Sequence, residues 1–247
     1  MCTSFIYRKS AVLIGMNFDN DGKDFKVSVK PVGKFQVSVS VQNTFYPSIG
    51  VNREGMFVND MMVDPCEAGK YKRQTEKRWV TTSLVKYVME EAAGMDDVHS
   101  LLQRVEIVNA PNASTHPMIV DRHGNSCVVE PGRKNLISRQ RDSDWVILTN
   151  FPLSVYTEVA PAQVSGSGSD RYLAARQRLA SLSGPVTVAQ AFKVLDAVKQ
   201  DGPEWTTELS LVYDGVRRAL YYCLDRKFDE ITKCDFKTPS EFIRQHG

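Results

Sequence analysis

Roughly the first sixty residues are a succession of short strand-like runs, joined by links too short to contain a crossover helix. Two of the runs flank the turn-like RKS at 8–10, and a further turn is expected at VNREG, residues 51–55. Strands joined by such short links pair in antiparallel fashion, because parallel neighbours need a connection of about a dozen residues or more. The strand-like runs are residues 3–8, 11–16, 25–31, 34–42 and 56–63.

The rest of the chain mixes helical and strand-like segments. Residues 83–94 place apolar side chains on one helical face and end at Gly94. Thr187 and Gln190 form a capping box at the start of a second amphipathic segment, 187–198. Hairpins and clustered helices favour the α+β class, with antiparallel sheets packed against helices. Two more helices are expected at 96–105 and 170–182, and strands at 116–121, 125–131, 145–152, 208–214 and 219–225, the last two closing the chain.

The composition is that of a globular protein with a sizeable core. The chain has 247 residues, of which 42% are hydrophobic. The stretch SGSGSD at 165–170 has the composition of a linker, but the segments on either side are too incomplete to fold alone. We therefore interpret it as a loop and treat residues 1–247 as a single domain. The net charge of +2 gives no reason to expect nucleic acid as a partner.

The cysteine pattern bears on the compartment. The five cysteines are odd in number and no two have CxxC spacing, so neither a disulfide framework nor a zinc site is expected. A reducing compartment fits best. The sequence shows neither a signal peptide nor an apolar run near the roughly 20 residues of a membrane helix. We expect a cytoplasmic protein with no membrane partner and no metal or organic cofactor.

Cys2 follows the initiator methionine directly and allows two interpretations. It can be a buried residue of the first strand, as free cysteines often are. It can instead be a nucleophile that acts once Met1 has been removed, a step that a small second residue favours. The thiol then shares one residue with a free α-amine of pKa about 7.7–8.0, which is partly neutral at pH 7 and can accept the thiol proton. No catalytic histidine is then needed.

Short motifs elsewhere favour the nucleophile. The opening MCTSF, GMNFD at 15–19 and LTNFP at 148–152 resemble the choloylglycine hydrolase and penicillin V acylase family, N-terminal-nucleophile hydrolases of linear amides. Further segments are similar to that family and occur in the family's order from residue 2 to about residue 225. They are GVNREGM at 50–56, HPMIVDRHGNSCVVE at 116–130, SDRY at 169–172, and TTELSLVYD at 206–214 followed by ALYYCLD.

The resemblance implies a four-layer αββα sandwich of two antiparallel sheets between helix layers, a small-molecule amide substrate and a homo-oligomer. It implies that Cys2 attacks the amide carbonyl to form a thioester, and that Asp19 accepts a hydrogen bond from the α-amine. Asn150 would donate to the oxyanion, and Arg171 would stabilise charge near the thiol. Taken without the family, Asp19 also fits a turn, Asn150 a strand end before Pro152, and Arg171 a solvated helix position.

Two positions depart from the family pattern. Met16 stands where the family usually has arginine, which removes a cation that would lower the thiol pKa and hold Asp19. The family's second oxyanion asparagine aligns best with Met62. Asn59 is near and could substitute after a change of strand register, although adjacent residues point to opposite faces. Loss of both groups would mean altered substrates, acyl transfer or no activity.

We predict a hydrolase that cleaves a linear amide C–N bond, with Cys2 as the nucleophile after removal of Met1. An acyltransferase with the same site and a non-catalytic small-molecule-binding protein of the same fold are the alternatives. The sequence leaves the acyl and amine groups open among bile-salt conjugates, phenoxyacetyl β-lactams, acyl-homoserine lactones and N-acyl amino acids.

Other residues with potential chemistry are interpreted as structural. The basic run 70–78 is expected to be a solvated loop, with recruitment of an anionic substrate as the alternative. The tryptophans are expected either to line an acyl pocket or to pack in the core; they are Trp79, Trp145 and Trp205. The histidines are scattered and are expected on loops or at the surface; they are His99, His116, His123 and His246.

Overall fold

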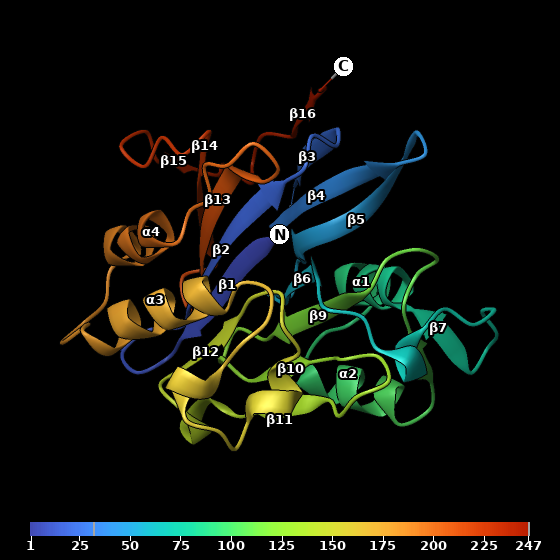
Figure 1. Cartoon of the computed structure of the whole chain (residues 1–247). Helices are drawn as coiled ribbons and strands as arrows, with labels where there is room; N and C mark the ends of the chain where they lie inside the picture. Colours follow the sequence, from blue (N-terminus) through green and yellow to red (C-terminus); the bar gives the residue numbers. More distant parts are fainter. Residues whose placement is uncertain (32, 247) are drawn as a thin grey trace. The chain divides into compact units, whose positions relative to one another are not determined.

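The structure, a computed structural model, describes residues 1–31 and 33–246. It divides into two compact units, each built from two separate stretches of the chain (Figure 1). The first unit contains residues 1–22 and 139–234, and the second contains residues 23–138 and the segment that begins at Asp235. Within the described residues, each unit has one large antiparallel sheet and two α-helices, which confirms the α+β class.

The first unit is a six-stranded sheet in the order β12-β1-β2-β13-β14-β15, and helix α4 packs against β2 and β13. Every neighbouring pair of these strands is antiparallel. The strands are β1 (Cys2–Tyr7), β2 (Leu13–Asn20), β12 (Trp145–Leu148), β13 (Thr206–Asp214), β14 (Ala219–Leu224) and β15 (Thr232–Lys233). The helices are α3 (Ser169–Ala180) and α4 (Val188–Ala197), with short 3-10 turns at Gln140–Asp142, Leu153–Tyr156 and Pro161–Gln163.

The core of the first unit lies between its sheet and its helices. Successive residues of a strand point to opposite faces, so Phe5 of β1 lies on the face that packs against Leu179 of α3 and Leu195 of α4. Gly15 of β2 makes room for the Phe5 ring, because a Cβ at this position would lie 2.4 Å from it. The first glycine of the GMNFD segment is therefore required by packing.

Asn17 of the same segment also serves the fold. Its Nδ2 donates a hydrogen bond to the backbone carbonyl of Leu195 at 2.9 Å, near the end of α4. Its Oδ1 accepts a hydrogen bond from the Ser210 hydroxyl at 2.7 Å. The fully buried Asn17 side chain thus joins β2 to both α4 and β13, and its polar atoms are satisfied as burial requires.

The second unit is an eight-stranded antiparallel sheet in the order β11-β10-β9-β6-β5-β4-β3-β16. Helix α1 packs against β5, β6 and β9 of this sheet, and a short parallel pair, β7 with β8, lies beside α1. The large-sheet strands are β3 (Phe25–Lys30), β4 (Lys34–Val41), β5 (Thr44–Val51), β6 (Phe57–Met62), β9 (Thr115–Val120), β10 (Ser126–Val128), β11 (Leu136–Ser138) and β16 (Ser240–Arg244). The other elements are β7 (Arg78–Val80), α1 (Thr81–Glu90), α2 (Met95–Leu102), β8 (Glu106–Val108) and a 3-10 turn at Glu67–Gly69.

Asn52 ties the turn between β5 and β6 to the end of α1. Its Nδ2 donates to the carbonyls of Val88 at 2.7 Å and Ala92 at 2.8 Å. Its Oδ1 accepts from the backbone N–H groups of Glu54 and Met56, both at 2.9 Å. The last carbonyls of a helix have no partner within the helix, so Asn52 closes the turn and satisfies the helix end at once.

We expect Asn52→Ala to lower the free energy of unfolding by about 2–4 kcal/mol, because it leaves several buried polar groups without partners. Urea unfolding followed by circular dichroism measures this change. The exposed neighbour Arg53, changed to alanine, is the control and should shift stability by about 0.5 kcal/mol or less. Equal effects of the two substitutions would show that the Asn52 hydrogen bonds do not stabilise the fold.

Most elements expected from the sequence are present, including the hairpins of the first sixty residues and the capping box at Thr187. Two expectations were wrong. The chain does not close with the strand at 219–225, because β15 and β16 follow and β16 pairs with β3. His116 is not at the surface but fully buried in β9, where its Nδ1 lies 3.2 Å from Oε1 of Glu130.

Candidate active site

Strand pairing in the first unit brings three of the predicted site residues together. Strand β1 lies between β2 and β12, and Cys2 pairs with the β2 residue that immediately precedes Asp19. On the other side of β1, Ser4 pairs with Leu148, so Asn150 follows this pair by two residues, at the end of β12. Positions 2, 19 and 150 are thus made neighbours by the topology of this sheet.

The backbone of Cys2 is held on both sides. Its N–H donates to Oδ1 of Asn150 at 3.1 Å, and its carbonyl accepts from Nη1 of Arg171 at 2.6 Å. Nη2 of Arg171 also donates to Oδ1 of Asn150, at 2.7 Å. Because Oδ1 of Asn150 accepts these two bonds, its Nδ2 occupies the other branch of the amide as a donor. Arg171 is therefore a buried member of this network and not a solvated helix residue.

A glycine makes the position of Arg171 possible. Gly168 precedes α3 and has a φ of +79°, a conformation that favours glycine. A Cβ on Gly168 would lie 2.5 Å from Nη2 of Arg171. The segment SGSGSD is a loop, as expected, and Ser167 in it accepts a backbone hydrogen bond from Asn150 at 3.2 Å. The loop thus holds Asn150 and admits the guanidinium group.

The Asp19 carboxylate is buried and surrounded by donors. Oδ1 accepts from the Thr207 hydroxyl at 2.5 Å, and Oδ2 accepts from Nε2 of Gln200 at 2.6 Å. Nη1 of Arg171 lies 3.6 Å from Oδ2. Burial raises the pKa of Asp19, while the hydrogen bonds from Thr207 and Gln200 and the charge of Arg171 oppose this rise. Asp19 is therefore not merely a turn residue.

Sequence patterns alone did not reveal two of these contacts. Thr207 of β13 pairs with Asp19 of β2. It lies in the family-like segment TTELSLVYD, but that resemblance did not identify Thr207 as a site residue. Gln200 lies in the loop after α4 and belongs to none of the recognised motifs. Its proximity to Asp19 depends on tertiary structure alone.

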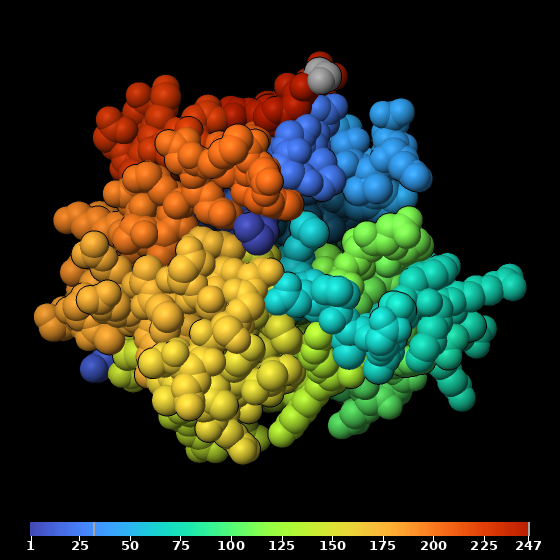
Figure 2. All heavy atoms as spheres, viewed as in Figure 1, coloured from blue at the N-terminus to red at the C-terminus, as the bar shows by residue number. Residues whose placement is uncertain are grey.

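The Cys2 thiol is buried, and the amino terminus beside it is partly buried. Burial raises the pKa of the Cys2 thiol, against the lowering effect of the α-ammonium group. Burial also lowers the pKa of the Met1 α-ammonium group, which donates to the Asp19 carbonyl at 3.2 Å. The position just before β1 therefore favours the neutral form of an amine. The space-filling view shows that the N-terminal end, in dark blue, reaches the surface (Figure 2).

The two departures from the family pattern occupy different places. Met16 is buried in β2, opposite Ser4, so it brings no charge to the sheet. Arg171 of α3 instead places a cation beside Asp19. Asn59 lies in β6 of the second unit, where its Oδ1 accepts from the N–H of Met118 at 3.2 Å. Met62 of the same strand is exposed. A role for Asn59 in the site stays a prediction.

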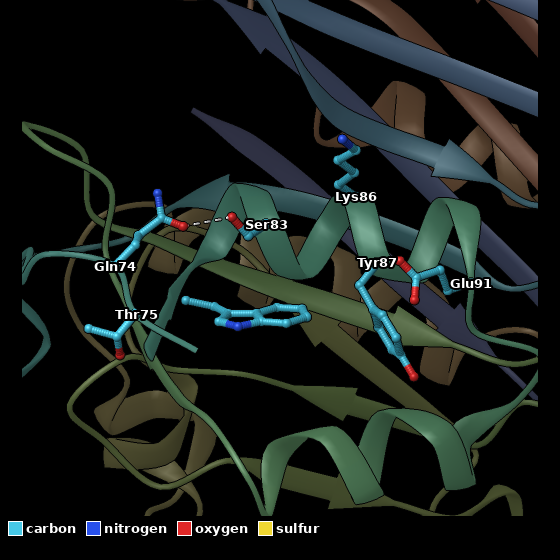
Figure 3. A pocket seen from close by; sticks show the side chains of 7 residues that line it. Gln74, Thr75, Ser83, Lys86, Tyr87 and Glu91 are labelled. Carbon is cyan, nitrogen blue, oxygen red and sulfur yellow. Dashed lines mark hydrogen bonds between the residues drawn. The ribbon is translucent and has the colours of Figure 1, made fainter. Parts of the chain in front are cut away.

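The second unit carries a separate pocket of about 290 Å³ (Figure 3). Trp79 and Tyr87 form its aromatic part, with ring centroids 6.0 Å apart and planes at 70°. In the close-up, Lys86 points away from Tyr87, whereas Glu91 lies beside it. In the basic run 70–78, Lys72 and Arg78 both form ion pairs with Glu106.

Solved structures show which fold the chain has. The chain is similar to a mutant form of a conjugated bile acid hydrolase from Clostridium perfringens, with a TM-score of 0.71, 15% identity, and coverage of 99% of this chain and 97% of that one. It is similar to a penicillin V acylase from Agrobacterium tumefaciens, with a TM-score of 0.63, 17% identity, and coverage of 91% and 83%. A Caenorhabditis elegans N-acylethanolamine-hydrolyzing acid amidase ortholog gives 0.57, 14%, and coverage of 87% and 93%. The fold is that of the N-terminal-nucleophile hydrolases.

The sequence family is more specific than the fold. Residues 2–157 match the family model of linear amide C–N hydrolases, choloylglycine hydrolase family. The chain belongs to this family and is an amidohydrolase. The resemblance expected from the MCTSF, GMNFD and LTNFP segments is confirmed. No curated protein sequence gives a significant match.

Two further properties concern the described residues only. None of the helices found there is long and apolar enough to cross a membrane. Within the same residues, no group of three or more histidine, cysteine, aspartate or glutamate side chains is placed to hold a metal ion.

Proposed function

We propose that the protein hydrolyses a linear amide with Cys2 as an N-terminal nucleophile, after Met1 has been removed. The observation that carries the proposal is the closed network around Cys2, in which Asn150 and Arg171 hold its backbone. A cysteine that served only as core packing would need no such polar support. Family membership supplies the reaction class, hydrolysis of a C–N amide bond.

The reaction begins with transfer of the thiol proton of Cys2 to its own α-amine. The Sγ thiolate attacks the amide carbonyl, and the electron pair of the C=O bond moves to oxygen. Nδ2 of Asn150 is the proposed donor to this oxyanion, since Oδ1 is already turned toward Arg171 and Cys2. The C–N bond then breaks, the ammonium group protonates the departing amine, and a thioester remains.

Water completes the cycle. The α-amine, neutral again, takes a proton from a water molecule that attacks the thioester carbonyl, and the C–S bond breaks to release the carboxylic acid. The thiolate regains a proton from the ammonium group. Each proton removed is returned, so the scheme balances with water as its only co-reactant.

The names of the similar proteins suggest the first substrates to try: a conjugated bile acid, penicillin V and an N-acylethanolamine. The intact mass of the purified protein is measured first, to establish that the chain begins at Cys2. Each amide is then incubated with it, with and without an added amine. Release of free acid supports hydrolysis, and an amide of the added amine indicates acyl transfer. If a wide panel of amides gives neither turnover nor acylated Cys2, the alternative of a non-catalytic binding protein is favoured.

Asn150 provides a test of the oxyanion assignment. We expect Asn150→Asp to lower kcat by about 10²–10³-fold with a small change in KM, because it keeps the Oδ acceptors but loses the Nδ2 donor. Asn150→Ala loses both and should be at least as slow. If the aspartate variant kept wild-type kcat while the alanine variant lost it, Asn150 would act only as an acceptor for Cys2 and Arg171.

A further inference from the structure

The loop between α4 and β13 is closed by hydrogen bonds between its two ends. The N–H of Gln200 donates to the Thr207 hydroxyl at 2.8 Å, and the N–H of Thr207 donates to the Gln200 carbonyl at 3.0 Å. Inside the loop, the N–H of Gly202 donates to the Trp205 carbonyl at 3.1 Å, and the Thr206 hydroxyl donates to the Gly202 carbonyl at 2.9 Å. The loop therefore presents Gln200 and Thr207 as a rigid pair.

The closure also orients the Thr207 hydroxyl. A threonine hydroxyl has one proton to donate. Because the Thr207 oxygen accepts from the Gln200 N–H, its own proton is directed to Oδ1 of Asp19, 2.5 Å away. The closure uses only the backbone of Gln200, and its side chain donates to Oδ2 of Asp19 at 2.6 Å. Each carboxylate oxygen of Asp19 thus receives one neutral donor from the same loop.

The charged groups that face Asp19 come from other elements. They are Arg171 of α3, at 3.6 Å, and the α-amino group that precedes β1. Arg171 in turn donates to the Cys2 carbonyl and to Asn150. Through Arg171, the orientation and charge of Asp19 are linked to the position of Cys2. The side chains of Gln200 and Thr207 themselves donate to Asp19.

We propose that Gln200 and Thr207 are positioning residues that hold Asp19 as a fixed carboxylate beside Arg171 and the amino terminus, and so set the lower pH limit of activity. This role rests on the proposed function. Hydrogen bonds to a carboxylate favour its charged form. Without them, the buried Asp19 would take up a proton at higher pH, and Arg171 would lose the charge that it faces.

The test compares Gln200→Met and Thr207→Val with Thr206→Val as a matched control. Thr206 donates within the same loop but not to Asp19, so its loss reports on loop stability alone. Gln200→Met keeps the hydrogen bonds that the backbone of residue 200 makes with Thr207. It therefore still tests the proposal if Thr207→Val fails to fold. Thr207→Ser keeps the hydroxyl and serves as the rescue. The titration of Asp19 is followed by NMR of protein labelled with carboxyl-¹³C aspartate, with Asp19→Asn for assignment.

We expect the Asp19 titration midpoint to rise by about one pH unit in Gln200→Met and Thr207→Val, and to stay unchanged in Thr206→Val and Thr207→Ser. On whichever amide the wild type hydrolyses, kcat should fall about 10- to 100-fold, and the acid limb of the pH profile should move upward with the midpoint. An unmoved midpoint, or lost activity with an unmoved acid limb, would overturn the proposal. If the wild type hydrolyses no amide, the proposed function fails, while the titration still decides whether the pair holds Asp19.

Discussion

Cys2→Ala is expected to lower kcat/KM for any amide substrate by about 10⁴-fold or more, because it removes the sulfur atom that we propose forms the covalent bond to the acyl group. Cys2→Ser should be nearly as slow, since a hydroxyl is a far weaker acid than a thiol and gives its proton to an amine less readily. Both substitutions are small, and the backbone contacts of residue 2 with Asn150 and Arg171 do not use the side chain. Steady-state hydrolysis and mass detection of a trapped thioester measure the loss.

Cys127 is the matched control for this prediction. Like Cys2 it is buried, but it lies in the apolar core between the second sheet and its helices. Burial raises the pKa of its thiol to about 12, so it remains protonated and unreactive near pH 7. Cys127→Ala should keep most of the activity. An equal loss from Cys2→Ala and Cys127→Ala would contradict the assignment of the nucleophile.

The parts of the site that the sequence predicted are those with short-range signals. Cys2 is marked by its place after Met1, whereas Asp19 and Asn150 lie in the family-like segments GMNFD and LTNFP. The strand pairing then explains how such distant segments come together, because β2 and β12 flank β1. Periodicity and turn residues were likewise sufficient for the hairpins and helices.

The remaining parts depend on contacts that leave no local pattern. Gln200 and Thr207 reach Asp19 only because the α4–β13 loop closes beside β2. A buried histidine such as His116 cannot be distinguished from an exposed one until its partner, Glu130, is known. Asn52 lay in a recognised motif, yet its function as the partner of the α1 carbonyls appears only in three dimensions. Strand β16 lacked a clear signal because it is short and largely exposed.

The second large effect concerns the residue before Cys2. A form of the protein in which a residue that cannot be removed precedes Cys2 should lose about 10³-fold or more of its activity. With that residue present, the nitrogen of Cys2 is an amide, which cannot accept the thiol proton at any pH near 7. The partly buried α-amine of Met1 is no substitute, because it donates to the Asp19 carbonyl and belongs to a different residue.

Protease release provides the decisive comparison. The chain is produced behind a cleavable tag whose removal leaves Cys2 as the first residue, so that one preparation is assayed before and after cleavage. Activity should appear with cleavage, because the new α-amine is generated where the Cys2 N–H now donates to Oδ1 of Asn150. The same tagged protein carrying Cys2→Ala should stay inactive after cleavage. Equal activity before and after cleavage would mean that the base is not the α-amine, and another proton acceptor near Cys2 would have to be sought.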